Sequence, residues 1–324
     1  SNDLTKIQLA VYCSGKRQSD SFNGSELRYV NISANGIASV FYDVYCILDS
    51  VKKGDDSILI LGVSGAIVLP FVRLFCKTRI LINVDGVEWK RDKWGLVAKT
   101  FLRLSEFLAG KSAHKVIADN TGIADHILEE YSHKSEVIAY GGDHAIRCGP
   151  KKIPFVTPDI FALALCRIEP ENNVVMILDG FVETPEFPLI FIGNWSASLY
   201  GTSVRKKYSE YPHLILLDPI YDIGVLRSIR SLATCYVHGH SAGGTNPSLV
   251  EMMHFGACIL SYDCIFNRYT THNEALYFKN SDGLIMLLAD FDSNKGLAMG
   301  SKLARIANDE YVWSKIAEQY FDLL

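Results

Sequence analysis

Hydrophobic positions along the chain follow two alternating patterns. Short apolar runs rich in Val, Ile and Leu recur throughout, and most are separated by longer segments whose apolar residues are spaced as on one face of a helix. In the first half, these runs predict strands at residues 8–12, 26–32, 57–62, 79–84, 115–118 and 136–140. Strands that alternate with helices are typical of β-α units on a mostly parallel sheet.

The alternation is interrupted at residues 148–154, where two prolines, a glycine and two lysines indicate an interdomain linker. Beyond the linker the pattern predicts strands at residues 160–165, 189–192, 213–216, 234–238 and 257–261, and helices near residues 173–181, 223–231, 247–255 and 282–290. The chain has 324 residues, and single cores rarely grow beyond about 250–300 residues. We therefore expect one α/β domain at residues 1–150 and a second at residues 151–324.

Composition and charge narrow the class of protein. Apolar residues make up 48% and the net charge is −4, so the surface as a whole is not built for a polyanion, and no nucleic-acid partner is expected. The eight cysteines include no C-x-x-C pair, which favours free thiols in a reducing compartment. The longest uncharged run, residues 58–72, is too short to span a membrane, and no signal peptide begins the sequence, so we expect a cytoplasmic protein.

The glycine-rich loop after the predicted strand 234–238 permits two chemical hypotheses. Its G-x-S-x-G pattern around Ser241 is that of an esterase nucleophile elbow, for which Asp263 and His272 would complete a triad. An elbow places its helix directly after the serine, however, and here the N-cap and N1 residues of the next helix are Asn246-Pro247. The esterase remains the alternative hypothesis.

The second hypothesis is a nucleotide-sugar site. Free N–H groups at a helix start bind phosphate, and two adjacent glycines let the backbone approach a diphosphate closely. Glu251, one turn into the helix, would accept hydrogen bonds from sugar hydroxyls. The other interpretation is a capped turn with a surface glutamate. The predicted donor-binding residues in this segment are Gly243, Gly244, Thr245, Asn246, Ser248, Leu249 and Glu251.

Three segments together carry a family resemblance. Residues 243–257 (GGTNPSLVEMMHFGA) resemble the donor motif of family 4 glycosyltransferases. With residues 83–95 and 166–173 they are similar to the rhamnosyltransferase-like branch of bacteria, which builds surface polysaccharides such as capsule and lipopolysaccharide. The resemblance implies a GT-B fold, in which two Rossmann-like domains face each other across a cleft. It also implies a last helix packed back on the first domain, and sugar transfer with retention that needs neither metal nor cofactor.

The resemblance further implies the substrates. The donor would be dTDP-L-rhamnose and the acceptor a sugar on a lipid diphosphate. Two departures from the family are visible: Gly243 stands where a second acidic residue is usual, and no β-α unit precedes residue 8, so the first sheet looks one strand short. A non-catalytic module that binds nucleotide sugars is therefore a further alternative.

Other candidate residues follow predicted strands, where ligands of α/β sheets bind. By resemblance, Arg167 would grip the donor diphosphate bidentately, although it is also compatible with an ordinary surface arginine. Asp119, Tyr140 and Asp85 are the catalytic candidates. Asp119 would deprotonate the acceptor hydroxyl with Tyr140 as a hydrogen-bond partner, or alternatively would only cap the following helix.

Residues 89–104 combine basic and apolar side chains in an amphipathic pattern. Such a helix can lie on an anionic membrane surface, which a lipid-linked acceptor would require. The alternative is a helix whose apolar face packs on the sheet.

Overall fold

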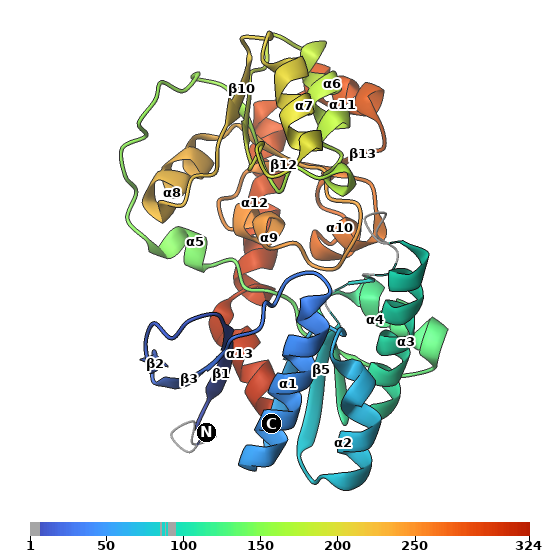
Figure 1. The fold of residues 1–324 in the computed structure, drawn as a ribbon. Coiled ribbons are helices and arrows are strands. Elements are labelled where there is room, and N and C mark those ends of the chain that lie inside the picture. The colour runs from blue at the N-terminus through green and yellow to red at the C-terminus, as the bar shows by residue number, and fades with distance from the viewer. Residues whose placement is uncertain (1–6, 85, 88, 90–94) are drawn as a thin grey trace.

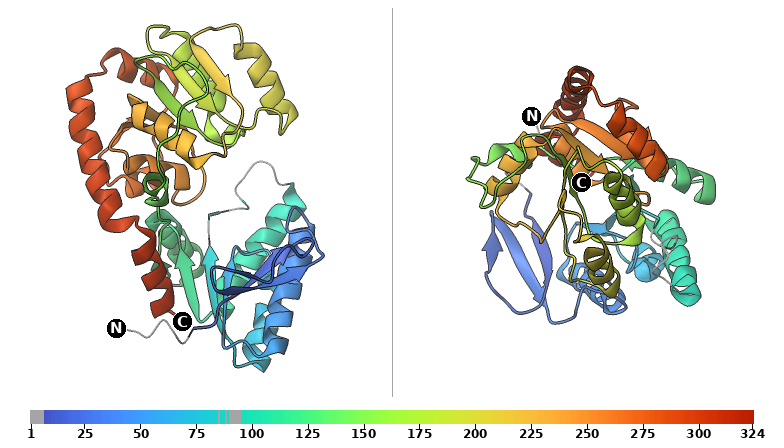
Figure 2. Two further views of the ribbon diagram at one scale, coloured as in Figure 1. Left: turned by 90° about the vertical axis from the view of Figure 1, so that its left-hand side faces the viewer. Right: turned by 90° about the horizontal axis from the view of Figure 1, so that it is seen from above.

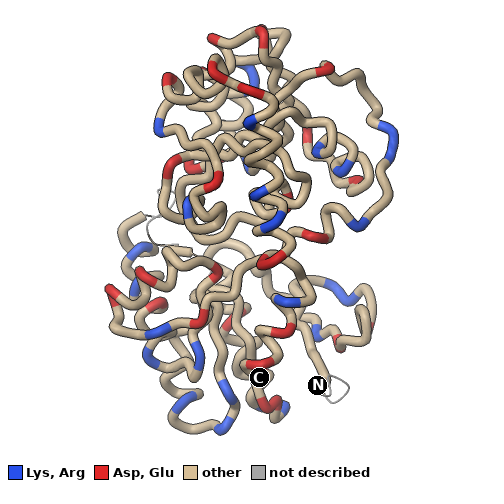
Figure 3. Tube along the Cα trace, turned by 180° about the vertical axis from the view of Figure 1, so that it is seen from behind, with Lys and Arg blue, Asp and Glu red and all other residues tan. Residues whose placement is uncertain are grey.

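The computed structural model describes residues 7–84, 86, 87, 89 and 95–324. Two α/β regions lie one above the other, with the N-terminal half of the chain below and most of the C-terminal half above (Figure 1). The first strand of the described chain and its C-terminus both lie in the lower region. Basic and acidic positions are interspersed along both regions in the view of Figure 3.

The larger sheet of the N-terminal half is parallel throughout. It is formed, in the spatial order β4-β5-β6-β7, by β4 (Ser57–Leu61), β5 (Arg79–Val84), β6 (Lys115–Ala118) and β7 (Glu136–Val137). The helices of this half are α1 (Ala38–Lys53), α2 (Leu69–Phe75), α3 (Leu96–Ser112) and α4 (Thr121–Tyr131), with a 3₁₀ turn η2 (Ala66–Val68) before α2. The core between helices and sheet contains Ile80, Ile82 and Val116, all of them buried.

The first strands of the chain do not join this sheet. The strand β1 (Ala10–Ser14) pairs in parallel with β3 (Ser25–Val30), and β2 (Ser21–Phe22) pairs antiparallel on the other side of β3. The expectation of one continuous N-terminal sheet is therefore wrong for the described residues. Within them, β1 and β4 each keep one unpaired edge, and Val11, Leu59 and Leu61 on these strands are exposed.

The C-terminal half contains a six-stranded parallel sheet in the order β10-β9-β8-β11-β12-β13. Its strands are β8 (Ala162–Leu165), β9 (Leu189–Ile192), β10 (Leu214–Leu217), β11 (Cys235–His238), β12 (Cys258–Tyr262) and β13 (Leu276–Phe278). The helices around it are α6 (Val174–Val182), α7 (Leu199–Tyr208), α8 (Ile223–Leu232), α9 (Pro247–Met253), α10 (Ile265–Thr270) and α11 (Ser281–Ala289), and η4 (Pro170–Asn172) precedes α6. Trp195, Phe181 and Phe191 are fully buried in its core.

The chain crosses between the two halves twice. The first crossing follows β7 and contains α5 (His144–Arg147), and the second lies between α12 (Ser293–Glu310) and α13 (Trp313–Asp322). The views of Figure 2 show the last helix beside the sheet of the lower half. There Ile316 of α13 packs on Leu81 and Ile117, so the C-terminal end of the chain completes the N-terminal core.

The predicted α/β class with parallel sheets is confirmed. Most predicted strands are found within two residues of their expected bounds, but residues 136–140 shorten to β7, and β2 and β13 were not predicted. Each of the eight cysteines is a free thiol.

Candidate active site

The carboxyl ends of β6 and β11 meet where the two halves touch. The Thr245 hydroxyl donates to the carbonyl of Asp119 at 2.5 Å, and Asn120 Nδ2 donates to Thr245 Oγ1 at 3.3 Å. Gly244 packs so closely on Asp119 that a β-carbon there would lie 1.7 Å from Asp119 Oδ1. Only glycine fits at this position, which explains the second glycine of the loop in steric terms.

Asp119 is therefore part of an interdomain contact. Its side chain is buried, with 1% of the residue exposed. The interpretation of Asp119 as the cap of the next helix is wrong, because Asn120 is the N-cap of α4 and accepts from the Gly122 N–H at 2.9 Å. Asn120 also donates to Thr270 Oγ1 at 3.2 Å, so the cap residue ties α4 to α10.

The start of α9 has the predicted geometry. Asn246 is the N-cap and Pro247 the first helical residue, and Asn246 Oδ1 accepts from the Ser248 N–H at 3.0 Å and from the Ser248 hydroxyl at 2.8 Å. Gly243, at the turn before it, has a φ of 118°, which favours glycine. Leu249 is fully buried and its backbone N–H donates to the Asn246 carbonyl at 3.1 Å, so the structure gives this predicted donor-binding residue no exposed group.

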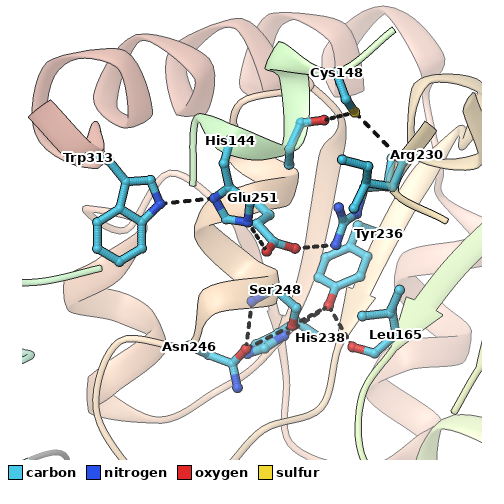
Figure 4. Close-up of polar contacts among 12 residues, drawn as sticks. His144, Cys148, Leu165, Arg230, Tyr236, His238, Asn246, Ser248, Glu251 and Trp313 are labelled. Carbon is cyan, nitrogen blue, oxygen red and sulfur yellow. Dashed lines mark hydrogen bonds and ion pairs between the residues drawn. The ribbon is translucent and has the colours of Figure 1, made fainter. Parts of the chain in front are cut away.

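Glu251 has partners that the sequence did not reveal. Its carboxylate pairs with Arg230 of α8, and its Oε1 lies 3.0 Å from His144 Nε2 of α5. Figure 4 shows the three side chains in one row with Trp313 beyond His144. The interpretation of Glu251 as an unpartnered surface glutamate is wrong: its side chain is 14% exposed and neutralises Arg230, which is 7% exposed.

A neutral histidine lies beneath the same loop. Burial, with repulsion from nearby His240 as a smaller cause, holds the pKa of His238 well below its usual range. The hydroxyl of the adjacent Tyr236 lies 2.9 Å from Ser248 Oγ and 3.2 Å from the Leu165 carbonyl. This chain of contacts joins the start of α9 to the end of β8, just before Arg167.

The remaining candidates occupy different environments. The Arg167 side chain is 62% exposed and lies 3.5 Å from Glu169, so it is accessible to a ligand. Tyr140 is half-buried in the first crossing, between β7 and α5. Asp85 lies outside the described residues, but Gly86 next to it faces the Gly243-Gly244 loop, because a β-carbon there would lie 3.3 Å from Gly243 Cα.

The esterase triad is not assembled. The Ser241 hydroxyl donates to the carbonyl of Glu171 at 2.8 Å. Asp263 accepts from Arg268 Nε at 2.5 Å, while His272 Nε2 lies 3.1 Å from Glu310. Each of the three side chains thus has a different partner, and the nucleophile-elbow hypothesis is wrong for this conformation.

Replacement of Ser241 provides the matching chemical test. If the chain transfers a sugar, as the resemblance implies, Ser241→Ala should keep that activity within about tenfold of the wild type, because the hydroxyl only braces a loop, whereas an esterase would lose several orders of magnitude. A fluorophosphonate probe that labels Ser241 would contradict this expectation.

The amphipathic segment 89–104 is only partly described, since residues 90–94 lie outside the described set. In α3 the side chains of Leu102 and Ala109 face the core, but Leu96 and Val97 are 85% and 87% exposed. Among the described helices, none combines the length and apolar character needed to cross a bilayer. The described residues also contain no group of three His, Cys, Asp or Glu side chains placed to hold a metal ion.

Comparison with known proteins identifies the fold to which this architecture corresponds. The family described as "Domain of unknown function (DUF1972)" matches residues 2–143, and no curated protein sequence matches the chain. Sucrose-phosphate synthase of Thermosynechococcus elongatus is similar in structure, with a TM-score of 0.81 at 14% identity over 98% of this chain and 88% of that chain. The chain has the GT-B fold.

Two further GT-B structures support that assignment. Anabaena HepE, solved with UDP and glucose, gives a TM-score of 0.70 at 12% identity over 92% of this chain and 85% of that one. A glycosyltransferase from Rickettsia africae gives 0.67 at 11% identity over 92% and 84%. The predicted GT-B fold is confirmed, and the residues around Gly244 and Asp119 lie where its two domains meet.

Proposed function

We propose that the protein is a retaining, metal-independent glycosyltransferase that binds a nucleotide diphosphate sugar on its C-terminal domain. The observation that carries the proposal is the apposition of the Gly243-Gly244 loop to Asp119, with Glu251 one turn behind the loop. The GT-B fold supports it, since HepE of the same fold was solved with UDP and glucose.

The donor diphosphate would bind the loop at residues 243–246 that precedes α9, because the first N–H groups of α9 itself donate to Asn246. Backbone N–H groups of that loop, with Arg167, would stabilise the negative charge that develops on the leaving diphosphate, which is where a transferase gains most. Thr245, Asn246 and Ser248 shape the loop. Glu251 accepts the hydrogen bonds of the ribose hydroxyls.

The acceptor would enter from the N-terminal domain. Asp119 would accept its proton with Tyr140 as a hydrogen-bond partner, and Asp85 is the third catalytic candidate. Because Gly244 covers the Asp119 carboxylate, the domains must separate before an acceptor reaches it. The cycle therefore includes an open state.

We propose dTDP-L-rhamnose as the donor and a lipid-diphosphate-linked sugar as the acceptor, on the strength of the family resemblance. A deoxyribose leaves Glu251 only the 3′-hydroxyl to bind. The exposed Leu96 and Val97, with Lys99 and Arg103 on the same helix, suit contact with an anionic membrane on the cytoplasmic side.

Nucleotide binding tests the donor site. We expect UDP or dTDP to bind in calorimetry, and Arg167→Ala to weaken the binding about tenfold, because a charged hydrogen bond contributes about 1.5–3 kcal/mol. Arg205→Ala is the matched control, since Arg205 pairs with Asp218 elsewhere on the same domain.

Failure of the wild type to bind either nucleotide at millimolar concentration would refute the donor site. Tight binding of the nucleotide sugar with no transfer to any acceptor would instead favour the non-catalytic module.

A further inference from the structure

Both oxygens of the Glu251 carboxylate are engaged. Arg230 contacts Oε2 from within the C-terminal domain, and His144 contacts Oε1 from the first crossing between the domains (Figure 4). Two donors on different oxygens fix the plane of the carboxylate. Its remaining lone pairs then point in defined directions, which a ligand hydroxyl must match.

The proton on His144 can be located from its second partner. Trp313 Nε1 lies 3.0 Å from His144 Nδ1, and an indole nitrogen is only a donor. His144 Nδ1 must therefore accept, so the imidazole is neutral and its proton is on Nε2. That nitrogen is the one that lies 3.0 Å from Glu251 Oε1, so His144 stands between the Trp313 indole on one side and the carboxylate on the other.

Trp313 links these contacts to both crossings. Trp313 is the first residue of α13, and its backbone N–H donates to Asp143 Oδ1 at 2.8 Å. The Gly142 N–H donates to the Tyr311 carbonyl at 2.8 Å, so the two crossing segments are bonded to each other beside it. A β-carbon at Gly141 would lie 2.7 Å from the Trp313 ring, so the indole packs closely on this glycine.

We propose that His144 is a positioning residue for the donor nucleotide, which holds Glu251 in its ribose-binding orientation and ties it to the crossing at Tyr311–Trp313. The inference rests on the proposed donor site. His144 does not touch the reacting atoms. It acts through Glu251, and because its side chain is 50% exposed, its replacement leaves no cavity in the core.

Three substitutions distinguish the contact of the imidazole with Glu251 from its contact with Trp313. Gln places a donor near the former Nε2, Asn places a polar group near the former Nδ1, and Leu removes both. We expect His144→Leu and His144→Asn to weaken UDP or dTDP binding about tenfold in calorimetry, and His144→Gln to stay within about threefold. His133→Leu, in the loop after α4, is the control for loss of a histidine elsewhere in the chain.

Hydrogen exchange gives a second measurement. Nucleotide should slow exchange of the backbone amides at residues 311–313 in the wild type and in His144→Gln, but not in His144→Leu. If the wild type binds nucleotide and all three variants bind it equally well, the role of His144 is refuted while the donor site stands. Failure of Gln to restore what Leu loses would likewise refute it. If the wild type binds neither nucleotide, the proposed donor site itself is wrong.

Discussion

Asp119→Asn should lower turnover by about 10²–10⁴-fold and leave nucleotide affinity nearly unchanged, because it removes the proposed catalytic base while preserving the shape of the side chain. The structure makes this test cleaner in two ways. The cap of α4 is Asn120, so loss of a helix cap does not explain a defect at residue 119. The bond between the Thr245 hydroxyl and residue 119 uses the backbone carbonyl, which the substitution retains.

The measurement is sugar transfer from a nucleotide sugar to a lipid-diphosphate-linked sugar, with a thermal melt to verify folding. Asn120→Asp is the matched control. Aspartate keeps the helix cap, because it caps as well as asparagine, but it removes the hydrogen bonds that Asn120 donates to Thr245 and Thr270. Near-normal turnover in folded Asp119→Asn would remove Asp119 from the mechanism and leave it an interdomain contact.

Glu251→Ala should destabilise the fold by about 3–5 kcal/mol, because it leaves the guanidinium of Arg230 buried without its carboxylate. We therefore expect a large drop in melting temperature in addition to any loss of nucleotide binding. Glu210→Ala, an exposed glutamate of the same domain, should change stability by less than about 0.5 kcal/mol.

Removal of both charges distinguishes the cause. The double variant Arg230→Met, Glu251→Met should recover most of the lost stability, since no buried charge then lacks a partner. A single Glu251→Ala variant that melts like the wild type would mean that Arg230 finds water or another partner. The Arg230–Glu251 pair would then contribute nothing to the stability of the fold.

Local signals in the sequence were sufficient for much of the fold and for the start of α9 after the glycine-rich loop. The cap at Asn246 and the proline after it depend on residues adjacent in sequence, and they define the start of α9 as predicted. The strands of the C-terminal sheet are continuous apolar runs because both faces are buried, and such runs are readable without long-range information.

Contacts between distant residues could not be read in the same way. His144 and Arg230 reach Glu251 from α5 and α8, and no pattern along the chain relates them. The closeness of Gly244 to Asp119 depends on how two domains meet, which a loop sequence does not encode by itself. The split of β1 and β3 from β4 likewise depends on pairing partners, because strand propensity says nothing about which edges find each other.

The two crossings are bonded to each other between Gly142 and Tyr311, at the point about which the two domains would rotate. Gly142 has no room for a side chain, since a β-carbon there would lie 2.7 Å from the Glu251 backbone nitrogen. Two chain crossings that are bonded to each other at one point would resist sliding and twisting of the domains, but would let one domain rotate away from the other. If the two domains open, rotation about this point would move the loops close to it least and the loops far from it most. An acceptor that needs Asp119 uncovered would be admitted, and the spent nucleotide released, by the same rotation.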